Sequence, residues 1–377
     1  MSADQPLTVL HVNTERTWRG GEQQTLYLLD GLAARGVKNI LVAKLGGAMA
    51  ERARAAGHEV VEMRMRGEAD VSVPWRIRKL IREHGVQLLH AHTSHGHVYI
   101  QLAAVLCGRD RPQVIVHRRV DFSIFRRSFL GLNRFKYLHG VDRYVTVSRA
   151  IKRVLEDDGI PGERIRVVHS GIDMSRIEDA PDRKAELRAE LAVPEGHALV
   201  VNVAHFADHK GQIYLVEAAP KIFESCPETV IAIVGDGELR EPLMEKAREL
   251  GVMDRMRFPG FRDDVPSILK AADVFCMPSH MEGLGTSVLD AMAARCPVVG
   301  TEAGGMPEML EHEVNGLVCP IRDSAAVATH VTRLLQDPEW ARGLAEKAYE
   351  TCRAGFSRAA MVEGNLAVYR EMIAARG

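Results

Sequence analysis

The alternation of short apolar runs with helical patterns is the feature that most restricts the fold of this chain. Stretches such as Gln23–Arg35 and Arg76–His84 space their apolar residues three and four apart, as an amphipathic helix does. The apolar runs around them are expected strands: Leu7–Val12, Asn39–Ala43, Val86–His92, Gln113–His117, Arg143–Val147 and Arg166–Val168. Strands that alternate with helices form a parallel sheet covered on both faces. The sequence therefore predicts an α/β fold.

A charged segment with two prolines, Asp173–Glu195, interrupts the alternation, and the same pattern restarts after it. The later expected strands are Ala198–Ala204, Val230–Val234, Arg257–Phe258, Val274–Met277, Pro297–Gly300 and Gly316–Cys319. A chain of 377 residues is also too long for one ordinary core. We expect two doubly wound domains, residues 1–175 and 176–357, followed by a C-terminal helix within 358–377 that returns to the first domain. Such sheets bind ligands at the carboxyl ends of their strands.

Composition excludes several classes of protein. With 49 Lys and Arg against 50 Asp and Glu, the chain has no overall basic field for nucleic acid. The six cysteines are scattered without a CxxC pair, which is typical of reduced thiols in the cytoplasm. No segment is apolar enough to span a bilayer, and the first residues do not resemble a signal peptide. These features indicate a cytoplasmic enzyme.

The segment Pro278–Gly305 carries the strongest functional signal. An apolar run ends there in a glycine-containing loop with Glu282, and a helical pattern, Thr286–Ala294, follows with Asp290 in its first turns. Free backbone N–H groups at such a loop and helix start suit phosphate and sugar oxygens, and carboxylates suit hydroxyl-rich ligands. Asp290 has a structural alternative, because an acid near a helix N-terminus also stabilises the helix dipole.

Two further loops follow the first strand of each expected domain. The paired glycines Gly20 and Gly21 let the backbone approach a ligand closely, although a tight turn also explains them. Lys210, with His205 five residues before it, is placed to neutralise a diphosphate, although a solvated lysine is the alternative.

Histidines gather at the end of one expected strand, at His90, His92, His95 and His97. A metal site would normally add an acid or a thiol, and none accompanies them, so structural histidines are the default interpretation. One imidazole at a strand's carboxyl end nevertheless suits substrate binding or proton transfer.

Residues 117–139 interleave basic and aromatic side chains. Such a surface suits an anionic membrane or acceptor, an ordinary amphipathic element, or nucleic acid. In a chain of nearly neutral charge we favour the first.

The motifs together resemble the GT-B-fold retaining glycosyltransferases of family 4. Their order along the whole chain carries the resemblance: RGGE at 19–22, HAH at 90–92, VTVS at 145–148, RVVHSGID at 166–173, VAHFADHKG at 203–211, VGDGE at 234–238, FPGFRDDVPSIL at 258–269, EGLG at 282–285 and GG at 304–305. The resemblance implies two Rossmann-like domains that face each other across a cleft, the first for the acceptor and the second for the nucleotide-sugar donor.

Carried over residue by residue, the resemblance implies catalytic roles for His92, Lys210 and Glu282. His92 would lie beside the reacting sugar, Lys210 would bind the diphosphate, and Glu282 would bond sugar hydroxyls. The implied donor-binding residues are Gly20, Gly21, His205, Arg262, Leu284, Gly285, Thr286 and Asp290, with Arg262 near the base and Asp290 on the ribose.

Three positions depart from the family's usual residues. His205 stands where an arginine is usual, Asp290 where a glutamate is usual, and Ser170 where an asparagine is common. His205 affects how the charge of the diphosphate is neutralised, and Asp290 affects the contact with the ribose.

The predicted function is retaining, metal-independent transfer of a sugar from a nucleoside-diphosphate sugar to a lipid-linked or surface glycan, without a cofactor. Peripheral contact with the cytoplasmic face of the membrane through residues 117–139 is expected, and nucleic acid is not an expected partner. The alternatives are another GT-B enzyme, such as a UDP-sugar epimerase or a sugar phosphorylase, or a catalytically weak sugar-nucleotide-binding protein.

Overall fold

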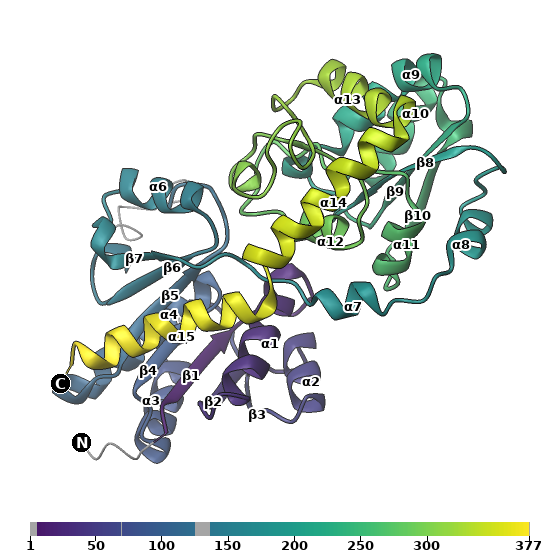
Figure 1. The fold of residues 1–377 in the computed structure, drawn as a ribbon. Helices are drawn as coiled ribbons and strands as arrows, with labels where there is room; N and C mark the ends of the chain where they lie inside the picture. The colour runs from purple at the N-terminus through teal and green to yellow at the C-terminus, as the bar shows by residue number, and fades with distance from the viewer. Residues whose placement is uncertain (1–5, 69, 125–135, 377) are drawn as a thin grey trace. The chain divides into compact units, whose positions relative to one another are not determined.

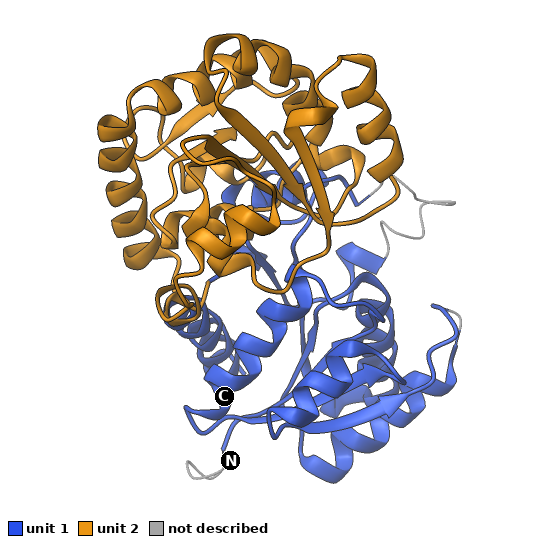
Figure 2. Cartoon of the chain, turned by 90° about the vertical axis from the view of Figure 1, so that its right-hand side faces the viewer, with its two compact units in different colours: residues 1–171, 358–377 blue, residues 172–357 orange. Residues whose placement is uncertain are grey.

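A computed structural model describes residues 6–68, 70–124 and 136–376 (Figure 1). The chain divides into two compact units, which are described separately (Figure 2). Unit 1 comprises residues 1–171 and 358–377, and unit 2 comprises residues 172–357. The sequence placed the corresponding boundaries at residues 175 and 357.

Unit 1 is built on a parallel sheet with the strand order β3-β2-β1-β4-β5-β6-β7. Its strands are β1 (Thr8–Asn13), β2 (Lys38–Lys44), β3 (Glu59–Met63), β4 (Leu88–Ala91), β5 (Gln113–Arg118), β6 (Arg143–Thr146) and β7 (Ile165–Val167). Its helices are α1 (Gly20–Ala33), α2 (Ala48–Ala55), α3 (Ser72–His84), α4 (Ser94–Cys107), α6 (Arg149–Asp157) and α15 (Arg358–Ala374), with short 3-10 turns η1 (Gly108–Asp110) and η2 (Gly162–Arg164).

The two faces of the unit 1 sheet carry separate hydrophobic cores. Leu10 of β1 and its neighbours pack with side chains of α3 and α4, such as Ile77 and Ile100. On the other face, Val9 packs with Leu28 of α1 and with residues of α15 such as Leu366. The C-terminal helix therefore supplies part of the core of unit 1, and it lies along the sheet in Figure 1.

Unit 2 repeats the architecture with the strand order β10-β9-β8-β11-β12-β13, again parallel. Its strands are β8 (Ala198–Val203), β9 (Thr229–Val234), β10 (Met256–Gly260), β11 (Val274–Cys276), β12 (Val298–Thr301) and β13 (Leu317–Cys319). Its helices are α7 (Met174–Glu178), α8 (Lys184–Glu190), α9 (Gln212–Ser225), α10 (Arg240–Glu249), α11 (Val265–Ala271), α12 (Thr286–Ala293), α13 (Ser324–Gln336) and α14 (Pro338–Gly355), with 3-10 turns η3 (Asp208–Lys210), η4 (Met253–Arg255) and η5 (Met306–Glu308).

The structure confirms the predicted fold class, because both units are parallel α/β sheets with helices on their faces. Long apolar side chains fill the core of unit 2, among them Phe206, Leu215 and Ile231. All six cysteines are unpaired thiols. Among the described helices, none combines the length and apolar character needed to cross a membrane.

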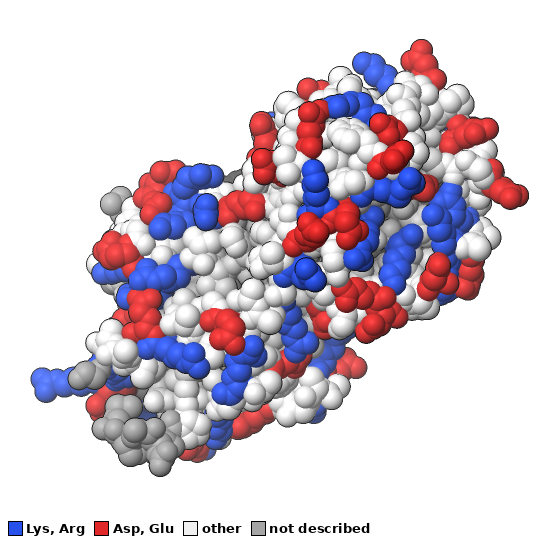
Figure 3. Space-filling model, in the orientation of Figure 1, with Lys and Arg blue, Asp and Glu red and all other residues white. Residues whose placement is uncertain are grey.

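The charge distribution agrees with the near-zero net charge. On the face shown in Figure 3, Lys and Arg side chains lie interspersed with Asp and Glu side chains over both units. This face therefore presents no extended surface of one sign.

Candidate functional site

Strand order places a ligand-binding edge in each unit. In unit 2, β8 lies between β9 and β11, so the connections from β8 and from β11 leave the sheet in opposite directions. Ligands of open α/β sheets bind at the carboxyl ends of the strands at such a switch point. Lys210 ends the turn after β8, and Glu282 lies in the loop after β11. The fold therefore brings these two predicted residues to one edge.

Lys210 and Glu282 form an ion pair at this edge. The Lys210 Nζ atom lies 2.6 Å from Glu282 Oε2, and the two side chains are only 21 % and 10 % exposed. The Ser279 hydroxyl donates to the same carboxylate oxygen at 3.4 Å. A cation and an acid are thus held together in a largely buried position.

Backbone contacts fix the loop that carries Glu282. His280 N donates to His209 O at 3.0 Å, and Gly305 N donates to Glu282 O at 3.1 Å. The turn after Lys210 requires glycine, because Gly211 has φ +64° and a Cβ there would lie 2.1 Å from the Pro278 carbonyl oxygen. The lysine turn, the glutamate loop and the glycine pair after β12 therefore form one assembly.

Helix α12 begins directly after this loop. Gly285 precedes it with φ +96°, a conformation that favours glycine, and a Cβ there would meet Met309 Cε at 2.9 Å. No side chain caps the helix, which starts at Thr286, while Leu284 is 2 % exposed and anchors the loop. The first amides of α12 thus lie beside the Lys210–Glu282 pair and suit an anionic or hydroxyl-bearing ligand.

Asp290 lies one turn further along α12. Its Oδ2 atom is 3.3 Å from Arg176 Nη2, and burial raises the pKa of the carboxyl to about 6 against the opposing charge of Arg176. The structure thus gives Asp290 a partner within unit 2, which the sequence did not reveal.

His205 is a weak replacement for a permanently charged arginine. Its side chain is 42 % exposed, and Nε2 lies 3.5 Å from Glu238 Oε2. An imidazole, unlike a guanidinium, is charged only when it is protonated.

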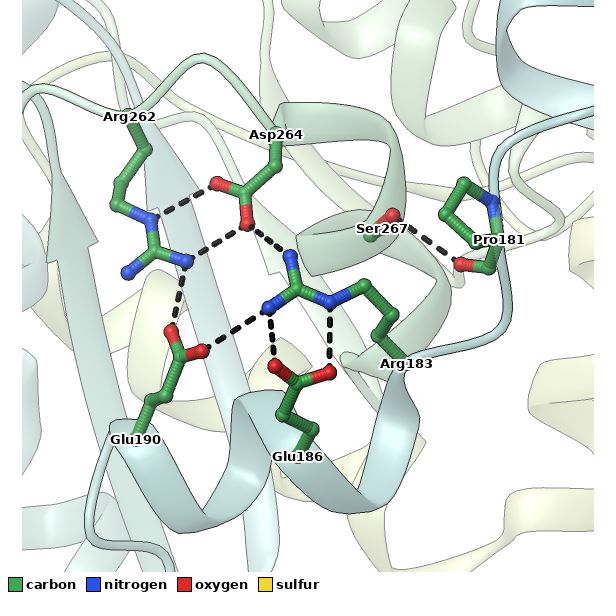
Figure 4. A network of polar contacts seen from close by, with 7 residues as sticks. All are labelled: Pro181, Arg183, Glu186, Glu190, Arg262, Asp264 and Ser267. Atoms are coloured by element: carbon green, nitrogen blue, oxygen red, sulfur yellow. Dashed lines mark hydrogen bonds and ion pairs between the residues drawn. The ribbon is translucent and has the colours of Figure 1, made fainter.

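Arg262 belongs to a network of charges on helix α8 and the loop after β10 (Figure 4). Its Nε and Nη2 atoms donate to the two oxygens of Asp264 at 2.8 and 2.7 Å, and Nη2 also reaches Glu190 Oε2 at 2.8 Å. Arg183 bridges the same Asp264 and Glu190 at 3.1 Å each. Two of the three nitrogens of Arg262 therefore serve this network, which sequence reasoning missed.

In unit 1 the corresponding switch point lies between β1 and β4. Helix α1 begins at Gly20, and Glu22 fixes this start because Arg19 N and Asn13 Nδ2 donate to its two oxygens at 3.1 and 3.2 Å. A Cβ on Gly21 would lie 3.8 Å from Arg119 Cδ, an ordinary contact. Packing within unit 1 therefore does not require glycine at position 21.

Histidines from neighbouring strands meet at the same edge. His11 of β1 pairs in register with His90 of β4, and the rings of His90 and His117 stack at 5.4 Å between centroids. The ring of His92 lies 4.2 Å from that of His90, and Tyr369 of α15 bonds His90 Nδ1 at 2.6 Å.

A directed chain of hydrogen bonds fixes the ring of His92. Asn39 Nδ2 donates to two backbone carbonyls, so its Oδ1 accepts from His11 Nε2 at 3.2 Å. His11 Nδ1 must then accept, which makes His92 Nε2 the donor at 3.0 Å. His92 Nδ1 is left as an acceptor and lies 3.3 Å from Arg119 Nη2. Both ring nitrogens of His92, whose residue is 6 % exposed, are thus engaged within unit 1.

The buried histidines are neutral at physiological pH. Burial lowers the pKa of His11 to about 3 and lowers the pKa of His90, His92 and His117 well below the usual value. Among the described residues, His11, His90 and His92 each place a ring nitrogen within 4.8 Å of the others, close enough for a metal ion. A metal on His92 Nε2 would require a proton on Nδ1, which faces the donors of Arg119. The hydrogen bonds therefore oppose a metal at this cluster.

The interpretation of residues 117–139 as one exposed surface is wrong for three of its described residues. His117 and Arg118 are buried, as is Tyr137, while Phe122 is 38 % exposed. Residues 125–135 lie outside the described part of the chain. His117 lies in β5, where the residues from Val114 to Arg118 are all buried. The available signal was the expected strand Gln113–His117 itself, because a parallel sheet is covered on both faces.

Comparison with known proteins identifies the family of this chain. The profile of the family described as Glycosyltransferase Family 4 matches residues 18–176, and that of Glycosyl transferases group 1 matches residues 183–351. The chain belongs to the family 4 glycosyltransferases of the GT-B type. It is 31 % identical to a GDP-mannose-dependent alpha-(1-6)-phosphatidylinositol monomannoside mannosyltransferase of Mycobacterium tuberculosis, over 76 % of this chain and 77 % of that protein.

Other relatives extend the comparison. The lipopolysaccharide core biosynthesis glycosyltransferase LpsE of Rhizobium meliloti is 27 % identical over 92 % of this glycosyltransferase and 94 % of that protein. Anabaena Alr3699/HepE, solved in complex with UDP, has the same fold, with a TM-score of 0.85 and 20 % identity over 97 % of this chain and all of that one (100 %).

Proposed function

We propose that this glycosyltransferase moves a sugar from a nucleoside-diphosphate sugar to a glycan or lipid-linked acceptor, with retention of configuration and without a metal or cofactor. The largely buried pair of Lys210 and Glu282, at the carboxyl edge of the unit 2 sheet, is the observation that carries the donor assignment. Relatives named for lipopolysaccharide and phosphatidylinositol mannoside synthesis support the acceptor class.

The pair suggests an exchange of partners on donor binding. Without a ligand, the Lys210 ammonium and the Glu282 carboxylate neutralise each other at 2.6 Å. A diphosphate oxygen would compete for Lys210, and the Glu282 oxygen that it leaves would accept hydrogen bonds from sugar hydroxyls. Both charges would then be matched by ligand groups, which avoids a buried unpaired charge.

The same groups address the chemical problem of transfer. Breaking the bond between the anomeric carbon and the phosphate oxygen develops negative charge on the diphosphate and positive charge on the sugar. Lys210 and the first amides of α12 would stabilise the departing diphosphate by preorganised electrostatics. We propose that the diphosphate leaves and the acceptor attacks on the same face of the sugar, because no described carboxylate is assigned as a nucleophile on the opposite face. The leaving diphosphate would then accept the proton of the acceptor hydroxyl.

We propose that the protein contacts a membrane only peripherally, where it meets a lipid-linked acceptor. His117, Arg118 and Tyr137 are buried and would not take part. Co-sedimentation of the protein with anionic vesicles, compared with neutral vesicles, tests this contact.

Thermal unfolding with a panel of nucleoside diphosphates and their sugars tests the donor assignment. A ligand at 100 to 1,000 times its dissociation constant stabilises a protein by about 3–4 kcal/mol. We expect nucleoside diphosphates of one base to stabilise the wild type and to leave Lys210→Ala without this stabilisation. The control Glu245→Ala, at an exposed position, should be stabilised like the wild type. A wild type that no member of the panel stabilises would refute the proposal.

NMR of the product's anomeric centre tests retention, and activity in excess chelator tests metal independence. Product formation that requires an added acceptor separates a transferase from an epimerase, which needs none.

A further inference from the structure

Arg119 follows β5 and reaches the start of helix α1 within unit 1. Its Cδ atom lies 3.8 Å from the position that a Cβ of Gly21 would take, and its Nη2 lies 3.5 Å from Thr25 Oγ1. Its Nη1 donates to the backbone oxygen of His92 at 3.3 Å. The guanidinium therefore lies between the glycine pair after β1 and the histidine motif after β4.

The charge of Arg119 has no acidic partner in the part of the chain that the structure describes, since no carboxylate there forms an ion pair with it. Glu22 is the acid that acts on it most, and each oxygen of Glu22 already accepts one hydrogen bond, from Asn13 Nδ2 and from the amide of Arg19. Burial lowers the pKa of Arg119 to about 10, so it stays charged at neutral pH. The residue is only partly exposed. Arginines that leave water are normally paired, because an uncompensated charge away from water is costly.

Several donors of Arg119 are poorly used. A guanidinium carries five N–H groups, and the described contacts occupy three of them at 3.3–3.5 Å, near the long limit for a hydrogen bond. The Nε atom is buried and has no hydrogen-bond partner among the described residues. The chain from Asn39 through His11 to His92 holds the ring that Arg119 faces, so the guanidinium is oriented although its charge is not matched.

We propose that Arg119, together with the first amides of α1, forms an oxyanion site in unit 1 that takes a phosphate group of a substrate. Glycine at position 21 keeps the space beside the guanidinium open, since packing alone does not require it. His92 acts here as a positioning residue, through its backbone oxygen and ring. Naming the phosphate as a substrate's rests on the proposed function, whereas the site itself rests on the geometry of Arg119.

The phosphate could belong to the donor diphosphate or to a phosphorylated acceptor. Calorimetric titration of the full-length protein with pyrophosphate, inorganic phosphate, the preferred nucleoside diphosphate and the free nucleoside separates these sources. The variants are Arg119→Gln, Arg119→Lys and the matched control Arg76→Gln, an exposed arginine of α3. Charge-assisted hydrogen bonds are worth about 1.5–3 kcal/mol, which corresponds to a roughly 10- to 150-fold change in affinity.

We expect Arg119→Gln to weaken pyrophosphate binding at least about tenfold, Arg119→Lys to weaken it less, and Arg76→Gln to leave it unchanged. If the affinity for the nucleoside diphosphate falls in parallel while the affinity for the free nucleoside is unchanged, the site belongs to the donor. A loss confined to pyrophosphate and inorganic phosphate assigns it to the acceptor.

Wild-type affinity for every phosphate probe in folded Arg119→Gln and Arg119→Lys overturns the proposal. So does a wild type that binds none of the probes, or a variant that loses thermal stability but keeps phosphate affinity, since Arg119 would then be only structural. If pyrophosphate binds through Arg119 while no nucleoside diphosphate stabilises the wild type, the oxyanion site stands and the proposed function fails.

Discussion

Glu282→Gln separates the two roles proposed for the Lys210–Glu282 pair. Glutamine keeps the shape of the side chain but removes the charge that faces Lys210 at 2.6 Å. At that separation the Coulomb attraction is about 6 kcal/mol at an effective dielectric constant of 20 and about 1.6 kcal/mol at 80. Desolvation offsets part of this, and Lys210 is 21 % exposed, so we expect the free energy of unfolding to fall by about 1–3 kcal/mol.

The same substitution should affect binding and transfer in opposite directions. Lys210 no longer has an internal acid to leave, so Glu282→Gln should bind the bare nucleoside diphosphate at least as tightly as the wild type. The sugar loses a charged acceptor, so the rate of transfer should fall by about 100-fold or more, as when one preorganised contact is removed.

Urea unfolding, calorimetry with the nucleoside diphosphate, and product formation measure these three quantities on one protein. Glu245→Gln, at an exposed position of α10, is the matched control and should change none of them. Transfer within twofold of wild type in Glu282→Gln, or a tenfold loss of affinity for the bare diphosphate, would refute the partner exchange.

Four other substitutions test single features. Gly21→Ala should change the free energy of unfolding by less than about 0.5 kcal/mol but should weaken ligand binding. Gly211→Ala should lower the free energy of unfolding by more than about 2 kcal/mol, because its Cβ would lie 2.1 Å from a backbone oxygen. Urea unfolding of the two variants compares these values. Burial raises the pKa of Asp290 to about 6, so its proton stabilises the folded state below its unfolded pKa and this stability is lost as pH rises to about 6. That loss amounts to about 2–3 kcal/mol, and Asp290→Asn should remove it from a pH series of unfolding curves. Tyr369→Phe removes the partner of a buried imidazole and should cost about 1–2 kcal/mol in urea unfolding while leaving nucleotide affinity unchanged in calorimetry.

The sequence determined the fold class and the family. Alternating apolar runs and helical patterns are local features, and each one reports the burial of its own segment. Motif order then placed Lys210 after the first strand of the second sheet and Glu282 after the fourth, and parallel strands bring their carboxyl ends to one edge. These positions could be predicted because they follow from chain order and the geometry of a parallel sheet alone.

Only the tertiary structure decided which side chains meet. Strand order and register bring His11 beside His92 across 81 positions, and the connection after β5 brings Arg119 to both His92 and the glycine pair. Arg262, which the resemblance expects near a base, pairs with acids of α8 and of its own loop, and the sequence did not reveal those partners. A side chain's partner depends on the register and packing of segments far apart in the chain, and local patterns do not contain that information. For this reason the sequence placed Lys210 and Glu282 at one edge, but only the fold paired them.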